Sequence, residues 1–184
     1  MEKNPWVSLH SKTVYDNKWI RVTEDDVINP KGGPGIYGKV HFKNIAIGII
    51  AIDEQQHIWL VGQYRYTLNA YSWEIPEGGC PLSENPLEGA KRELKEETGL
   101  VADEWKELFR MHLSNSVSDE LAIIYLAAGL IQEEAEPEDT EDLQLQKVSV
   151  DQAYEMTETG AITDSISVAA ITKLKLMQLQ GKLI

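Results

Sequence analysis

The segment Gly78–Leu100, GGCPLSENPLEGAKRELKEETGL, predicts a helix with a defined start and end. Asn85 is a favourable N-cap, Pro86 takes the first helical position, where its missing N–H is not needed, and Glu88 stands three residues after the cap, as in a capping box. Gly99 suits the left-handed backbone conformation that ends many helices. The segment therefore predicts a helix of about three to four turns, with an apolar stripe along one side.

Three carboxylates gather on this helix. Glu93 and Glu97 fall one turn apart on the same edge, and Glu96 lies beside them. Crowded carboxylates raise one another's pKa, and a divalent cation such as Mg²⁺ or Mn²⁺ removes that penalty. The alternative is a solvated charged face, the usual explanation of a run such as KRELKEE. Arg92 and Glu84 are close enough in sequence to form an ion pair that would hold the preceding loop on the helix.

The wider spacing favours the metal site. Gly78 is followed after five residues by Glu84, and after seven more by the run Arg92–Leu100, RELKEETGL. This pattern resembles the signature of the Nudix hydrolase family at every position. The resemblance implies a three-layer α/β/α sandwich with a mixed central sheet, preceded here by an N-terminal β-strand extension. We divide the chain into that extension, residues 1–43, and a Nudix hydrolase domain, residues 44–184.

Composition limits the partners and the compartment. The formal net charge of −13 over 184 residues argues against nucleic acid as a partner, because binding of a long polyanion needs clustered Lys and Arg. Cys80 is the single cysteine, so we expect a reducing compartment and a loop thiol without a role. The apolar runs Ile45–Ile52 and Leu121–Ile131 are too short to span a bilayer, and the N-terminus lacks a signal-peptide core. We expect a cytoplasmic protein with no membrane partner.

The rest of the chain predicts further strands and two more helices. The cluster Asn29–Gly35 is interpreted as a hairpin turn, because no helix follows it. Ser149 and Gln152 predict a capping box, and Asp164 or Ser165 caps a last helix. Strands and helices in mixed order predict a sheet between helices. The expected strands are Trp19–Val27, Ile36–Phe42, Asn44–Ile52, Ile58–Tyr66, Ser72–Ile75, Trp105–Leu113, Glu120–Leu130 and Leu143–Val148.

Four segments outside the signature resemble one branch of the family, the ADP-ribose and nucleoside-diphosphate-sugar pyrophosphatases. One departure is the run Ser114–Ser118, which stands where the branch usually has a Pro-Gly turn. The resemblance implies metal-dependent hydrolysis of a nucleoside diphosphate sugar to a nucleoside monophosphate and a sugar phosphate, and the departure leaves open GDP-mannose beside ADP-ribose. The four segments are Val61–Tyr66, Trp73–Gly79, Ser118–Leu130 and Thr140–Ser167.

The resemblance also implies roles for the signature residues. Glu93 and Glu97 are the principal ligands of Mg²⁺, with Mn²⁺ possible, and Glu96 is a further ligand or orients them. A backbone carbonyl at Glu77 or Gly78 completes the set. Glu84 and Arg92 then hold these ligands in place.

A general base is expected in the acidic run Glu133–Asp142, because a glutamate in the equivalent loop of this branch activates water or binds metal. Glu141 is the best match, since it directly precedes Asp142 and the next strand, and Glu138 is the second. For the other acidic residues of the run we expect a solvated loop.

Substrate contacts are expected at Arg65, which can pair with a phosphate or form a surface salt bridge. Trp19, Tyr15 and Tyr37 are candidates to stack on a nucleobase, the alternative being ordinary packing. The branch implies a homodimer formed through the N-terminal segment. Two other functions are weighed: a nucleoside-triphosphate sanitising pyrophosphatase, and a non-catalytic nucleotide-sugar sensor, which is disfavoured because all signature glutamates are present.

Overall fold

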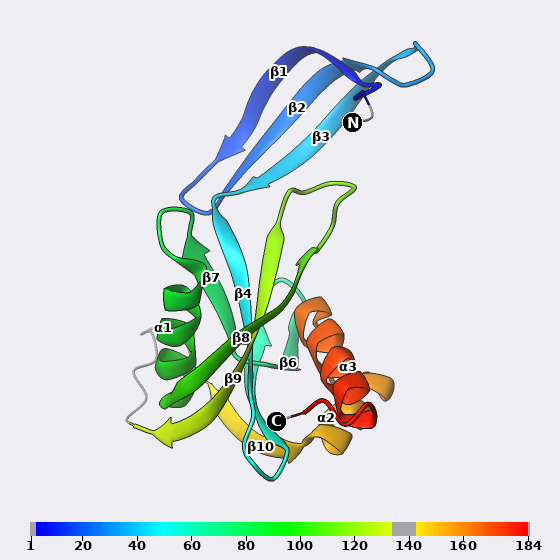
Figure 1. Cartoon of the computed structure of the whole chain (residues 1–184). Coiled ribbons are helices and arrows are strands. Elements are labelled where there is room, and N and C mark those ends of the chain that lie inside the picture. The colour runs from blue at the N-terminus through cyan, green and yellow to red at the C-terminus, as the bar shows by residue number, and fades with distance from the viewer. Residues whose placement is uncertain (1–2, 134–142, 184) are drawn as a thin grey trace.

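The computed structural model describes residues 3–133 and 143–183 of the chain (Figure 1). Its elements follow in the order β1 (Val7–Asp16), β2 (Ile20–Ile28), β3 (Pro34–Phe42), β4 (Asn44–Ala51), β5 (His57–Arg65), β6 (Ala70–Glu74), β7 (Glu77–Pro81), α1 (Pro86–Thr98), β8 (Leu100–His112), β9 (Leu121–Gln132), β10 (Gln144–Ser149), α2 (Val150–Glu158) and α3 (Ser165–Leu179).

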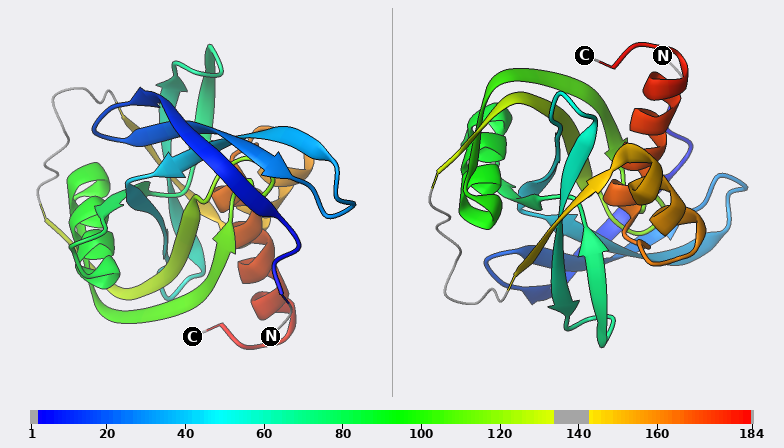
Figure 2. Two further views of the ribbon diagram at one scale, coloured as in Figure 1. Left: turned by 90° about the horizontal axis from the view of Figure 1, so that it is seen from above. Right: turned by 90° about the horizontal axis from the view of Figure 1, so that it is seen from below.

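Two sheets form the middle layer of the fold. One has the strand order β7-β4-β9-β8, in which β4 and β9 are parallel and the other neighbours antiparallel. The other has the order β10-β5-β6 and is antiparallel. Helix α1 lies on one side of this layer, and α2 and α3 lie on the other (Figures 1 and 2). The predicted α/β/α sandwich with a mixed central sheet is confirmed.

Strand β4 separates two hydrophobic clusters, because its side chains alternate between the two faces of the sheet. Ile47 and Ile49 pack with residues of α1, whereas Ile50 packs with residues of α2 and α3, and all three are fully buried. A strand buried on both faces was predicted from the continuous apolar run at this position. The clusters fix α1 and α3 on opposite sides of β4.

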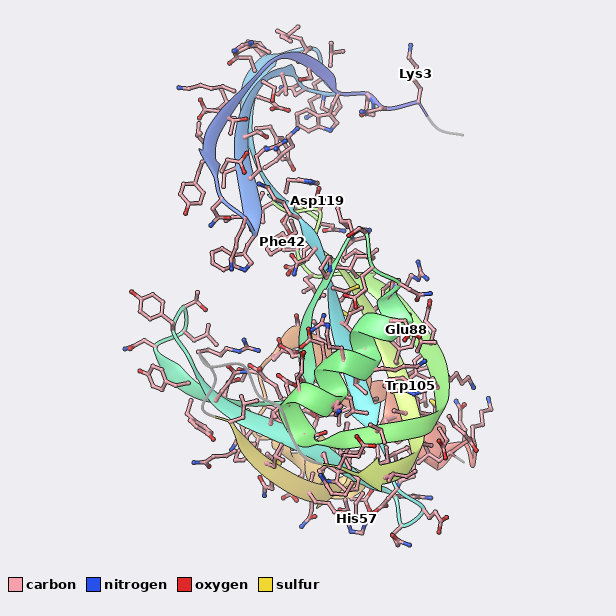
Figure 3. The ribbon with its side chains drawn as sticks, turned by 90° about the vertical axis from the view of Figure 1, so that its left-hand side faces the viewer. Lys3, Phe42, His57, Glu88, Trp105 and Asp119 are labelled. Atoms are coloured by element: carbon pink, nitrogen blue, oxygen red, sulfur yellow. The ribbon has the colours of Figure 1, made fainter. Side chains whose placement is uncertain are left out.

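The N-terminal sheet, which we define as β1, β2 and β3, projects from the rest of the chain (Figure 1). The predicted hairpin turn joins β2 to β3, and the backbone N–H of Asn29 donates to the carbonyl of Gly33 at 2.8 Å. The β8–β9 loop contacts β3: the N–H of Val40 donates to the carbonyl of Val117 at 2.8 Å. Figure 3 shows Phe42 close to Asp119 of this loop, and the Phe42 N–H donates to the Asp119 carboxylate at 2.9 Å.

The segment before the signature helix differs from the prediction. We expected a loop, but Glu77–Pro81 forms β7, which pairs with β4 from Gly48 to Asn44. Its glycines show no strand pattern, so only the pairing with β4 reveals it. Cys80 is fully buried within β7, and burial raises the pKa of its thiol. The expectation of a loop thiol was therefore wrong. Among the described residues, none of the helices α1, α2 and α3 combines the length and the apolar composition that a bilayer-spanning helix needs.

Candidate active site

Helix α1 begins and ends at the predicted residues. The Asn85 side chain accepts a hydrogen bond from the backbone N–H of Leu87 at 2.9 Å, and Gly99 ends the helix with a φ of 69°. The predicted capping box is not formed: the Asn85 side chain accepts from Leu87 rather than from Glu88, and the Glu88 carboxylate pairs with Lys91 at 2.8 Å. The helix position therefore follows from its N-cap and its terminal glycine.

Glu93 lies directly over the backbone of Gly78 in β7. A Cβ atom placed on Gly78 would come within 2.1 to 2.6 Å of the carboxyl atoms of Glu93, far inside any ordinary contact. The Glu93 side chain is 12% exposed. The signature glycine thus provides the space in which this carboxylate reaches the sheet.

Glu97 lies one turn further along α1 and is 4% exposed. Its Oε2 accepts a hydrogen bond from the backbone N–H of Glu77 at 2.9 Å. Hydrogen bonds to an ionised carboxylate are stronger than neutral ones and fix its orientation. Both predicted principal ligands, Glu93 and Glu97, therefore lie against the first two residues of β7.

Arg92 joins the remaining signature carboxylates. Its Nη1 donates to Glu93 at 2.8 Å and to Glu96 at 2.9 Å, while Nη2 donates to Glu84 at 3.4 Å and to the carbonyl of Gly79 at 3.2 Å. Burial lowers the pKa of Arg92, but the charge of Glu93 and these hydrogen bonds outweigh it, so the pKa lies above its ordinary value. The predicted ion pair between Arg92 and Glu84 is present.

The donor set at this edge of α1 consists of oxygen atoms. Among residues 3–133 and 143–183, no three acidic, His or Cys side chains are gathered as a metal cluster, and Arg92 faces two of the carboxylates instead. The chemistry nevertheless fits a hard divalent cation, because Glu93 and Glu97 bring carboxylates against the backbone of β7, and Arg92 holds the carboxylate of Glu96 beside that of Glu93.

Arg65, at the end of β5, lies in a clamp of two carboxylates. Its Nε donates to both carboxylate oxygens of Glu74 at 3.0 Å, and Nη2 donates to Glu77 at 2.8 Å and also contacts Glu74. Burial lowers the pKa of Arg65, but Glu74 outweighs it and raises the pKa. The Glu74 side chain is only 3% exposed. Arg65 therefore makes a largely buried ion pair rather than a surface salt bridge.

A cavity of about 620 Å³ lies beside this clamp. Burial, followed by the charges of Asp164 and Glu74, raises the pKa of Glu77 well above its ordinary value. Burial also raises the pKa of Glu120, and the charge of Asp164 adds to the effect. The lining includes the start of β7 and the start of α3: Asn44, Ala46, Ile47, Arg65, Thr67, Leu68, Glu74, Glu77, Gly78, Gly79, Leu113, Glu120, Thr163, Asp164, Ser165 and Ile166.

Sequence reasoning missed three acidic residues of this cavity. Asp164 was predicted only as a helix cap, and it is one, since it accepts from the N–H of Ser167 at 2.7 Å. Glu120 and Asp164 stand in the segments Ser118–Leu130 and Thr140–Ser167, but only the fold shows that they line the same cavity as Glu77. Glu74 stands in the WEIPEGG segment, and that segment was the available signal.

The predicted stacking residues lie on the N-terminal sheet. Trp19 and Tyr15 are 58% and 53% exposed. Tyr37 packs edge-on against Trp6, with ring centroids 5.4 Å apart, and its hydroxyl donates to the carbonyl of Ser116 at 2.7 Å. None of the three predicted residues lines the 620 Å³ cavity.

The predicted general bases, Glu141 and Glu138, lie outside the described residues. Glu133 is the last described residue before this part of the chain, and its carboxylate is 3.6 Å from Lys95 of α1.

Two family descriptions match the chain. Residues 42–168 match the NUDIX domain, and residues 6–40 match the nucleoside diphosphate sugar hydrolase N-terminal domain. Since the first match covers more than half of the chain, the protein belongs to the Nudix family and is a Nudix hydrolase, an enzyme class that requires a divalent cation. The predicted family is confirmed.

Individual proteins are similar to the chain over most of its length. The ADP-ribose pyrophosphatase of Mycobacterium tuberculosis is 32% identical over 176 residues, which cover 93% of this chain and 84% of that protein. The methanol dehydrogenase activator of Bacillus methanolicus is 30% identical, with 93% of each chain covered. The crystal structure of an ADP compounds hydrolase shares the fold over the whole length of both chains, with a TM-score of 0.87 at 22% identity.

Proposed function

We propose that the protein hydrolyses the pyrophosphate bond of nucleoside diphosphate sugars, such as ADP-ribose or GDP-mannose, to a nucleoside monophosphate and a sugar phosphate. The observation that carries the proposal is the Nudix domain preceded, at residues 6–40, by a nucleoside diphosphate sugar hydrolase N-terminal domain. The name of the Mycobacterium tuberculosis relative supports it. The cavity of about 620 Å³ lies within the range of small-molecule sites.

The proposed cation is Mg²⁺, with Mn²⁺ as the alternative. Glu93 and Glu97 would hold it with their side chains, Glu96 would be a further ligand or orient them, and a carbonyl of Glu77 or Gly78 would complete the set. A bound divalent cation neutralises the charge of the diphosphate and acidifies an attacking water. This role agrees with the placement of both principal carboxylates against β7.

The chain's own residues position these groups. Arg92 and Glu84 hold the carboxylates of α1 through the contacts described above. Arg65 supplies a fixed positive charge in the cavity, where its guanidinium can donate to a phosphate oxygen. Glu141 is proposed to take the proton of the attacking water, with Glu138 as the second candidate.

The N-terminal sheet is proposed to serve dimerisation and nucleobase binding. All residues of β1 are exposed, and an isolated three-stranded sheet buries little apolar area of its own. We propose that residues 1–43 form the dimerisation segment of a homodimer, that residues 44–184 form the catalytic domain, and that Trp19, Tyr15 or Tyr37 stacks on the base. A cytoplasmic location is proposed from the single cysteine, which is buried and free.

The test is release of phosphate, through a coupled phosphatase, from ADP-ribose, GDP-mannose, ADP-glucose and UDP-glucose, with Mg²⁺, with Mn²⁺ and with EDTA. Hydrolysis of dGTP is followed by chromatography without the phosphatase, which would attack it directly. We expect cation-dependent turnover of nucleotide sugars. Preference for dGTP would assign the protein to the sanitising enzymes. If none of the substrates is hydrolysed, the result would favour the sensor.

A further inference from the structure

Glu77 touches both sides of the site described above. Its side chain accepts a hydrogen bond from Nη2 of Arg65 at 2.8 Å, and its backbone N–H donates to Oε2 of Glu97 at 2.9 Å. We propose that the carboxylate of Glu77 is a positioning residue that sets Arg65 relative to the metal-binding edge of α1. The inference rests on the proposed function, which assigns the cation to Glu97 and the phosphate to Arg65.

The clamp leaves one edge of the guanidinium for a ligand. Nε of Arg65 donates hydrogen bonds to Glu74, and Nη2 contacts Glu74 and donates a hydrogen bond to Glu77. Within the described part of the chain, Nη1 of Arg65 donates no hydrogen bond, although Arg65 lines the cavity. Since a guanidinium is planar and rigid, holding Nε and Nη2 also fixes where the N–H groups of Nη1 point.

A contribution to folding stability does not explain why a carboxylate is present at Glu77. Glu74 already pairs with Arg65, so Glu77 is not needed to balance the charge of the guanidinium. Oε2 of Glu77 is buried, and no described residue donates a hydrogen bond to it. A buried carboxylate with an unsatisfied oxygen disfavours the folded state. A side chain that costs stability at the edge of a catalytic cavity is therefore best explained by its action on Arg65.

The two possible roles of Glu77 predict different changes in kcat and KM when its carboxylate is removed. If the carboxylate only adds negative charge, its removal should strengthen binding of an anionic substrate, and KM should fall with kcat unchanged. If it positions Arg65, kcat should fall by about tenfold in Glu77→Ala, because a displaced charge no longer meets the reacting phosphate. Glu77→Gln keeps an acceptor oxygen of the same reach and should recover most of that loss.

The experiment is a double-mutant cycle. We measure kcat and KM on the best substrate of the panel for the wild type, Glu77→Ala, Glu77→Gln, Arg65→Ala and the double variant Arg65→Ala/Glu77→Ala. We expect Glu77→Ala to unfold at the wild-type temperature or above it, and to have no further effect on kcat once Arg65 is absent. Additive losses, or an unchanged kcat in Glu77→Ala, would overturn the proposal.

A crystal structure of Glu77→Ala provides a readout that needs no substrate. We expect the guanidinium of Arg65 to be displaced or in several conformers, with the hydrogen bond from the backbone N–H of residue 77 to Glu97 retained. An unchanged Arg65 would refute the positioning role. If the wild type hydrolyses no nucleotide sugar, the proposed function fails, and this structure still decides whether Glu77 positions Arg65.

Discussion

Replacement of Gly78 by alanine tests the geometry of the site most directly. The new Cβ would lie 2.1 Å from an oxygen of Glu93, whereas ordinary contacts begin near 3.4 Å. The carboxylate therefore has to move by about 1 Å or more. A displacement of that size at a reacting centre lowers the rate by about 100-fold, which corresponds to about 2.7 kcal/mol.

The fold should tolerate this substitution. The φ of Gly78 is not positive, so alanine can adopt the same backbone conformation. We expect a thermal midpoint near that of the wild type, a kcat lower by about 100-fold, and a higher Mg²⁺ concentration for half-maximal activity. The assay is turnover of the best nucleotide sugar over a Mg²⁺ titration, with unfolding followed by circular dichroism.

Gly79→Ala is the matched comparison. There the new Cβ would meet Nδ2 of Asn44 at 2.5 Å, the end of a flexible side chain that can turn away. A smaller loss than in Gly78→Ala is therefore expected. Wild-type turnover and wild-type cation dependence in Gly78→Ala would show that the Glu93 carboxylate does not have to lie over Gly78 to support catalysis.

Three further predictions concern single side chains. Glu97→Gln should lower kcat by about 100-fold or more, because a neutral amide is a poor cation ligand. The circular dichroism spectrum should be unchanged, and wild-type turnover would contradict the ligand role. Burial raises the pKa of Glu120, so ionisation of this residue disfavours the fold as pH rises through and above about 4.3. Glu120→Gln should therefore raise the thermal midpoint at pH 7 but not at pH 3, and an equal shift at both would refute this electrostatic cause. Cys80→Ser places a hydroxyl in the cluster under α1 and should lower the free energy of unfolding by about 1–3 kcal/mol in urea titrations; an unchanged midpoint would show that the site accommodates a hydroxyl.

Local chemistry explains which elements are predictable. The cap at Asn85 and the glycine at Gly99 determine the ends of α1, and the apolar run of β4 identifies a buried strand. Strand β7 has no such pattern, because two of its five residues are glycine, and it exists through pairing with β4. Strand β1 was not among the predicted strands either, because its side chains are exposed throughout and none of them is part of a buried face.

The residues of the candidate site also fall into those that local sequence predicts and those that only the fold reveals. The carboxylates of α1 are predictable because their spacing lies within one helix, and so is the ion pair between Arg92 and Glu84. Asp164 comes from a segment about ninety residues away from Glu74 in sequence, and no local pattern connects the two. Only the packing of α3 against β4 places Asp164 in the cavity wall.

The two faces of β4 have a consequence for how such an enzyme can change its substrate. The cavity wall formed by the start of β7 belongs to a strand that packs with α1 in one hydrophobic cluster, whereas the wall at the start of α3 is anchored in the other. Substitutions under α3 can therefore widen or reshape the cavity without repacking the residues beneath α1. Selection for a new sugar can act on one wall while the hydrolytic chemistry is inherited unaltered on the other.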